Sequence, residues 1–88
     1  MEQKHWSVYI LECGDGTLYT GVTDDLPRRL KAHRAGKGAK YTRGRGPLEL
    51  RYTESCPDHG AALRREREIK RLKKTEKIVL CRNWHGGE

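Results

Sequence analysis

The chain has 88 residues, of which 34% are hydrophobic, and its formal net charge at neutral pH is +7. A chain this short buries only about 60–65% of its unfolded surface, so we expect a single domain over residues 1–88. The longest apolar run, Val8 to Leu11, is far below the roughly 20 residues of a membrane span, and no signal peptide is visible, which indicates a cytoplasmic protein. The positive charge favours a polyanionic partner, most simply nucleic acid; the short apolar run and the missing signal peptide argue against the rival, an anionic membrane surface.

The first predicted element is a β-hairpin. Residues 5–12 and 17–23 are rich in β-branched and aromatic side chains, and they flank a Gly-Asp-Gly turn. Side chains alternate between the faces of a strand, so a three-residue loop places Tyr9 and Tyr19 on the same face. A two-residue loop would direct the tyrosines to opposite faces and leave no shared site.

A helix is expected next, from about residue 26 to 35, ending at Gly36. Two leucines and His33 recur at helical spacing and form its apolar stripe. Arg29 lies beside this stripe, one turn before His33. Both side chains can therefore point the same way.

Residues 36–46 combine glycine with Lys and Arg, which predicts a loop, with a helical turn near Ala39 to Thr42 as an option. The glycine-lysine-serine/threonine ending of a P-loop is missing. Two interpretations remain open at this point: a flexible solvated connector, or a loop that contacts phosphates.

The second half of the chain predicts a strand followed by two helices. Apolar and polar residues alternate from Leu48 to Tyr52, directly after Pro47, which indicates a third strand with one buried face. Asp58 is suited to cap a helix over about 59–74, and a shorter helix is expected over 75–82.

Glu66 stands out on the longer of these helices, because an acid on an apolar face is unfavourable unless a partner meets it. One explanation is a salt bridge with Lys70 or with an arginine elsewhere. A ligand position for a divalent metal would explain the same placement. The apolar arc around Glu66 consists of Ala62, Leu63, Ile69 and Leu72.

The basic residues are unevenly distributed. Of the 19 Lys and Arg, only Lys4 lies outside the stretches 28–51 and 64–82. A solvated surface is the usual explanation of such runs. Here the two runs are expected to flank the third strand and to form a positive face suited to a phosphate backbone. The candidate nucleic-acid contacts are Arg28, Lys37, Lys40, Arg43, Arg45 and Lys70.

Three cysteines at wide spacing do not resemble a disulfide framework, so we expect reduced thiols. Cys56, His59, Cys81 and His85 could together supply two sulfur and two nitrogen ligands to zinc. Their spacings are loose and contain no CxxC, so this is the weaker interpretation.

Five residues thus stand apart from simple core packing: Tyr9, Tyr19, Arg29, His33 and Glu66. In this order and context they resemble the GIY-YIG nuclease domain family. Ser7-Val8-Tyr9 stands where that family has Gly-Ile-Tyr, and Tyr19-Thr20-Gly21 stands for Tyr-Ile-Gly. The arginine and the histidine follow at the family spacing, and the glutamate lies in the helix after the third strand. The likeness extends from about Trp6 to Cys81 and is greatest to small stand-alone bacterial members.

The resemblance implies an α+β fold, a three-stranded antiparallel sheet flanked by helices in the order β-β-α-β-α-α. It also implies a metal-dependent endonuclease acting on phosphodiester bonds of DNA, with structured or damaged DNA in repair or recombination as candidate substrates. The alternative is a non-catalytic nucleic-acid-binding module of the same fold. A monomer is expected, and a protein partner that supplies specificity is left open.

Each site residue has a role under this resemblance. Glu66 would hold Mg²⁺ or Mn²⁺, and Arg29 would contact the scissile phosphate. One of the two tyrosines, directly or with His33, would position or deprotonate the attacking water. A tyrosine base near neutrality needs its pKa lowered by roughly 3 units, for which Arg29, Lys40 and the metal have the right sign.

Overall fold

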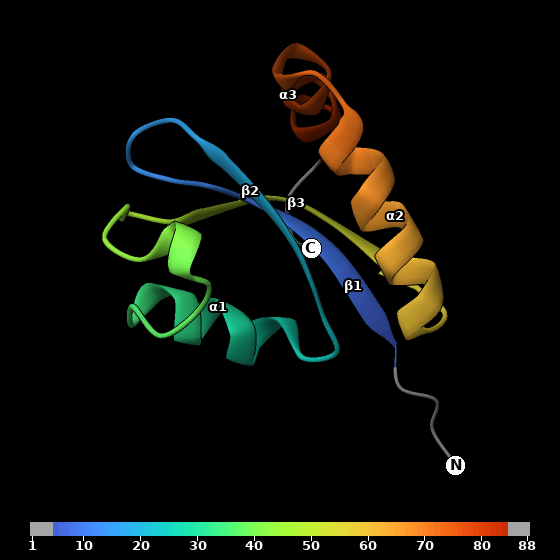
Figure 1. Cartoon of the computed structure of the whole chain (residues 1–88), viewed down its shortest axis with the longest axis horizontal. Coiled ribbons are helices and arrows are strands. Elements are labelled where there is room, and N and C mark those ends of the chain that lie inside the picture. Colours follow the sequence, from blue (N-terminus) through green and yellow to red (C-terminus); the bar gives the residue numbers. More distant parts are fainter. Residues whose placement is uncertain (1–4, 85–88) are drawn as a thin grey trace.

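The computed structural model describes residues 5–84 and has the expected α+β architecture. The strands form one antiparallel sheet in the order β2-β1-β3, so the first strand is central (Figure 1). No helix within the described residues is long and apolar enough to cross a membrane. The elements are β1 (Trp6–Glu12), β2 (Leu18–Thr23), α1 (Leu26–Arg34), the 3-10 helix η1 (Lys40–Thr42), β3 (Glu49–Cys56), α2 (His59–Arg71) and α3 (Lys74–Arg82).

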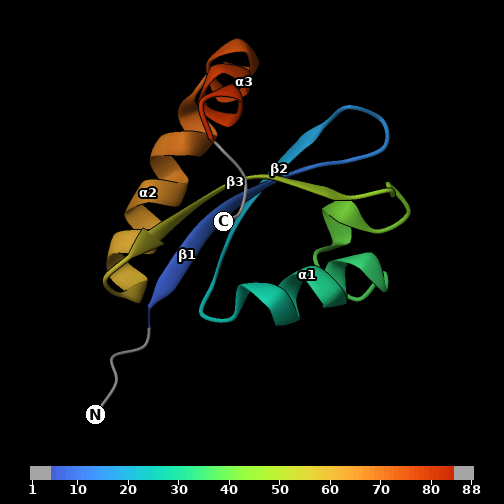
Figure 2. The same cartoon turned by 180° about the vertical axis from the view of Figure 1, so that it is seen from behind.

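The sheet separates two layers of helix. Figures 1 and 2 show α1 and η1 on one side of the strands, and α2 and α3 on the other. The apolar core lies between the sheet and α2, where alternate strand residues meet the apolar arc of the helix. The buried members of this core are Val8, Ile10, Cys56, Ala62 and Ile69. Burying an aliphatic side chain of this kind contributes about 1.5–3 kcal/mol, so this layer carries much of the stability.

The opposite face of the sheet presents the two tyrosines of the hairpin. The amide of Cys13 donates to the carbonyl of Thr17 over 2.8 Å, which closes a three-residue loop. In this register Tyr9 lies opposite Gly21, and Tyr19 lies opposite Leu11. The predicted shared face is therefore confirmed.

Helices α1 and α2 begin where the sequence indicated. The carboxylate of Asp25 accepts from the amide of Arg28 over 3.2 Å, and that of Asp58 accepts from the amide of Ala61 over 2.8 Å. Side-chain caps of this kind satisfy amides that have no partner within the helix. The predicted helix over 59–74 is shorter in the structure, because α2 ends at Arg71 and α3 begins at Lys74.

An ion-pair cluster fixes α2 against β3. Arg65 binds Glu54 of the strand and Glu68 of its own helix, each at 3.0 Å. The Tyr52 hydroxyl also donates to Glu54, over 2.6 Å. Burial alone would raise the pKa of Glu54, but the bonds from Tyr52 and Arg65 outweigh it and hold the pKa below its usual value. The turn of α2 that carries Glu66 is thereby held in place.

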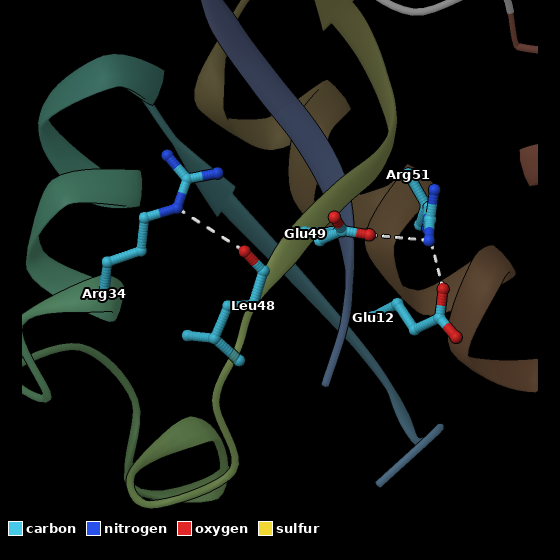
Figure 3. A network of polar contacts seen from close by, with 5 residues as sticks. All are labelled: Glu12, Arg34, Leu48, Glu49 and Arg51. Carbon is cyan, nitrogen blue, oxygen red and sulfur yellow. Dashed lines mark hydrogen bonds and ion pairs between the residues drawn. The ribbon is translucent and has the colours of Figure 1, made fainter. Parts of the chain in front are cut away.

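Polar contacts also secure the start of β3 (Figure 3). The register between β1 and β3 shifts next to Arg51, whose guanidinium reaches Glu12 and Glu49 at 2.7 Å each. Arg34 of α1 donates to the carbonyl of Leu48 over 3.4 Å. Exposed ion pairs contribute only about 0–1 kcal/mol, so these contacts matter more for alignment than for stability.

The glycine-rich segment 36–46 packs against the hairpin turn. The amide of Gly14 donates to the carbonyl of Arg45 over 2.6 Å, and the Arg45 guanidinium pairs with Asp15 at 2.6 Å. A Cβ at Gly14 would collide with the carbonyl of Gly46. These contacts contradict the interpretation of this segment as a flexible solvated connector, and they place η1 beside the tyrosines.

Candidate active site

A buried chain of hydrogen bonds lies at the centre of the tyrosine face. Tyr9 and His33 are only 1% and 2% exposed, and the Tyr9 hydroxyl lies 2.9 Å from Nε2 of His33. Nδ1 of His33 lies 2.9 Å from Oγ1 of Thr42, and that hydroxyl donates to the carbonyl of Ala39 over 3.0 Å. Three elements, β1, α1 and η1, therefore meet at one imidazole.

These hydrogen bonds assign the tautomer of His33. Because the Thr42 proton points to the Ala39 carbonyl, Oγ1 accepts the proton of Nδ1. Nε2 of the neutral ring is then an acceptor, and the Tyr9 hydroxyl donates to it. The arrangement lets His33 take a proton from Tyr9.

The pKa values of this pair support the same assignment. Burial and the charge of Arg29 lower the pKa of His33 below its ordinary value, so the ring is neutral near pH 7. Burial also raises the pKa of Tyr9, and Tyr19 adds to the increase. Arg29 opposes it, but its effect is smaller.

A tyrosine base would need the opposite direction, a lowered pKa, which nearby cations were expected to provide. Burial of the phenol is instead the largest influence on the pKa of Tyr9. Lys40, one of the expected cations, is not among the groups that act on Tyr9 in the described part of the chain. Tyr9 in the free protein is therefore a proton donor to His33.

Tyr19 completes an aromatic cluster and is only half-buried. Its ring centroid lies 6.3 Å from that of Tyr9, 5.4 Å from that of His33 and 5.8 Å from that of Tyr41. A Cβ at Gly21 would come within 2.6 Å of the Tyr9 hydroxyl, so only glycine permits this approach. Tyr19 is the hairpin tyrosine that solvent can reach.

Arg29 and Glu66 approach this cluster from different helices. Both act electrostatically on Tyr9, Arg29 by lowering its pKa and Glu66 by raising it. Arg29 is exposed on α1, whereas the side chain of Glu66 on α2 is only 18% exposed. Tyr9, Tyr19 and His33 thus form one cluster with Arg29 close by, whereas Glu66 lies on the helix at the other side of the sheet (Figure 1) and acts on Tyr9 only through its charge.

The carboxylate of Glu66 forms an ion pair with Lys70 on the next turn of α2, at 3.3 Å. The salt bridge considered from the sequence is therefore present. Since the Lys70 side chain is 55% exposed and flexible, it can turn away when another cation meets the carboxylate.

The donor groups fit a hard divalent ion better than zinc. Within residues 5–84 no group of three or more His, Cys, Asp or Glu is arranged to hold a metal. Mg²⁺ needs only one or two carboxylates, because it keeps several waters and binds substrate phosphates, and Glu66 can be that carboxylate. The zinc interpretation has no support here: His59 stacks on Trp6 at 3.9 Å, and His85 lies outside the described residues.

The candidate nucleic-acid contacts divide into two groups. Arg45 and Lys70 are engaged in ion pairs, with Asp15 and Glu66 respectively. The other four predicted contacts are exposed on α1, on η1 and in the loop around it: Arg28, Lys37, Lys40 and Arg43. These four lie on the same side of the sheet as the tyrosines and remain accessible to a polyanion.

Three residues near the site were not singled out from the sequence. Thr42 orients His33, and Tyr41 stacks on Tyr19. The His33 ring packs directly on Gly38, where a Cβ would meet its Cγ at 2.7 Å. The sequence pointed to them only through the helical turn expected near Ala39 to Thr42, which carries Tyr41 and Thr42.

Comparison with known proteins finds relatives that match most of the chain. The family description that matches residues 5–78 is "GIY-YIG catalytic domain". A UPF0213 protein of Halobacterium salinarum is 55% identical over 83% of this chain and 95% of its own length. Another, from Natronomonas pharaonis, is 54% identical over 98% of this chain and its whole length. A bacterial relative, from Oceanobacillus iheyensis, is 49% identical over 91% of this chain and 92% of its own length. The relatives are thus both archaeal and bacterial, whereas the greatest likeness was expected to bacterial members.

Two solution NMR structures share the fold. The UPF0213 protein of Bacillus halodurans is 50% identical, with a TM-score of 0.60 over 93% of this chain and 87% of that one. A protein of E. faecalis is 33% identical, also with a TM-score of 0.60, over 100% of this chain and 98% of that one. Both cover nearly the whole fold described above.

Proposed function

The chain belongs to the GIY-YIG nuclease family, and from this we propose that it is a metal-dependent endonuclease that hydrolyses phosphodiester bonds in DNA. The observation that carries the proposal is the buried hydrogen bond between Tyr9 and His33, which packs against Tyr19 and is subject to the charges of Arg29 and Glu66. Simple core packing would not bury a hydroxyl–imidazole pair beneath an exposed guanidinium. We further propose structured or damaged DNA, met in repair or recombination, as the substrate.

The hydrogen-bond direction suggests a proton relay. As water attacks the phosphorus, its proton would pass to the Tyr9 oxygen while the Tyr9 proton passes to Nε2 of His33. Since Tyr9 is only 1% exposed in the free protein, this relay requires that substrate binding open its hydroxyl to the water. The raised pKa of Tyr9 is no obstacle in such a relay, because no free phenolate forms. Thr42 would hold the other ring nitrogen protonated throughout.

The remaining residues would stabilise charge. Arg29 would donate to the non-bridging oxygens of the scissile phosphate through its planar guanidinium. Tyr19, which solvent can reach, would face the substrate. A Mg²⁺ or Mn²⁺ ion held by Glu66 would supply charge neutralisation at the phosphoryl and leaving oxygens.

The proposal is tested by incubating the protein with nicked, branched and single-stranded DNA in the presence of Mg²⁺ or Mn²⁺. Cleavage is expected with the wild type and not with Glu66→Gln, because the neutral amide is a poor ligand for a hard cation. Glu68→Gln, two residues further along α2, is the control for loss of a carboxylate; it should retain cleavage, because Arg65 keeps its ion pair with Glu54 of β3. If Glu66→Gln cleaves as fast as the wild type, the assigned site is wrong.

The closed state of the site favours a second candidate function, binding of nucleic acid without cleavage. Tyr9 and His33 are closed to solvent and Glu66 is paired with Lys70, as expected of a module that binds nucleic acid without cleaving it. Such a module would bind DNA with strong salt dependence but leave every substrate intact in both metals. The same incubation, read together with a binding assay, distinguishes the two functions.

A further inference from the structure

Tyr41 of η1 is an exposed aromatic residue beside the site. It is 43% exposed, and the other exposed large hydrophobic residues among those described are aliphatic, Ile78 and Val79 of α3. The proton relay does not use Tyr41. An aromatic ring left open to solvent next to a phosphate-binding site is suited to stack on a nucleobase.

The Tyr41 ring is held in a fixed position. It stacks on Tyr19 with an interplanar angle of 28°, at a centroid distance of 5.8 Å that implies a large offset. The Arg45 guanidinium lies 4.7 Å from the ring centroid, and Asp15 in turn holds that guanidinium at 2.6 Å. Because Tyr19 is strongly offset, the part of the ring that neither Tyr19 nor Arg45 covers stays open to solvent, and a ring fixed in this way loses little conformational entropy when a ligand stacks there.

A basic hollow lies directly beside this ring. Its volume is about 200 Å³, and it is lined by Tyr41, by Thr17 and Leu18 of the hairpin, and by Lys74 and Lys77 of α3. Neither lysine forms an ion pair with any residue in the described part of the chain. The hollow therefore combines a stacking surface with two cations that can meet a phosphate.

From this arrangement we propose that the hollow is a subsite for one unpaired nucleotide, with its base on Tyr41 and its phosphate at Lys74 and Lys77. This inference rests on the proposed function and specifies its substrate. A base within a duplex is stacked on both sides and cannot reach the ring, whereas a base in a gap, flap or single strand can. Because Tyr41 contacts Tyr19, the unpaired nucleotide lies next to the scissile phosphate.

The subsite is tested by binding in the Glu66→Gln background, in which the DNA stays intact. The probes are a duplex, and the same duplex with a 3-nucleotide flap that carries 2-aminopurine at each flap position in turn. Tyr41→Leu should weaken binding of the flap probe by roughly 5- to 150-fold and leave duplex binding unchanged. Tyr41→Trp should keep flap binding and quench 2-aminopurine at one position.

The lysines are tested separately. Lys77→Ala should weaken flap binding and reduce the salt slope by about 1, while Arg64→Ala, the same charge change in the first half of α2, should change it less. Figures 1 and 2 both place that half of α2 away from η1. This comparison also decides the matter if Tyr41→Leu fails to fold.

Equal effects of Tyr41→Leu on flap and duplex, or no effect on either, would overturn the subsite. Failure of the proposed function gives a different result, because the wild type would then cleave no substrate while preferential flap binding could persist. If the wild type cleaves DNA but binds flap and duplex equally well, the subsite alone is refuted.

Discussion

Replacing Thr42 by Val tests whether this hydroxyl sets the protonation of His33. The substitution keeps a β-branched side chain of nearly the same shape at a position that is 2% exposed. It removes the acceptor 2.9 Å from Nδ1 of His33 and the donor to the Ala39 carbonyl. Thr42→Ser, which retains the hydroxyl, is the matched control.

The magnitude follows from the buried N–H group. A buried donor without an acceptor costs about 1–3 kcal/mol, and the ring avoids this by moving its proton from Nδ1 to Nε2. That energy corresponds to a change of roughly 5- to 150-fold in the tautomer ratio. In the new tautomer Nε2 donates to Tyr9 and can no longer accept its proton.

The assay is nitrogen NMR of the histidine ring, which distinguishes protonated from unprotonated ring nitrogens. Wild type and Thr42→Ser should show a proton on Nδ1 of His33, and Thr42→Val a proton on Nε2. Cleavage by Thr42→Val should fall together with this change and should not recover when binding is saturated. If Thr42→Val keeps the wild-type tautomer and rate, Thr42 does not position His33 and the relay argument fails.

Three further predictions concern the packing and charge around the site. Gly38→Ala should lower the free energy of unfolding in urea by about 1–3 kcal/mol, because the new methyl group collides with the ring of His33; an unchanged midpoint would contradict that packing. The pKa of His33 is lowered in the folded protein. Below the ordinary histidine pKa near 6.5, the unfolded chain therefore binds more protons than the folded one. The contribution of His33 to the free energy of unfolding should therefore be fully present above pH 6.5 and decrease below it, by at most about 1.4 kcal/mol per pH unit. His33→Gln should reduce this pH dependence when unfolding in urea is measured from pH 7.5 to 5.5. Arg65→Met should leave the half-buried Glu54 without its ion pair and lower stability by about 1–2 kcal/mol, whereas Arg67→Met on the exposed side of α2 should change it by less than about 0.5 kcal/mol; equal effects would argue against the ion-pair cluster between α2 and β3.

The hairpin shows how far sequence reasoning reaches. The loop length between the two strands, together with strict alternation of side chains, was enough to predict that Tyr9 and Tyr19 share a face. The helix starts at Asp25 and Asp58 were similarly predictable, since a cap depends on the two or three residues that follow it. These features are local, so neighbouring residues determine them.

The pKa of Tyr9 shows where such reasoning ends. Nearby cations could be inferred from helical spacing, but the burial that outweighs them depends on α1, η1 and the sheet closing over the phenol. The same holds for the pairing of Arg45 with Asp15, which are 30 positions apart in the chain. Spacing alone gives no measure of such contacts.

The sequence by itself thus determined the order of the elements, the face shared by the tyrosines and the residue types that gather there. Only the tertiary structure decided the direction of proton donation between Tyr9 and His33, the role of Thr42 and the exposed ring of Tyr41. The physical reason is that periodicity and capping act over a few residues. Burial, tautomer and accessibility depend instead on segments that meet only after the chain has folded.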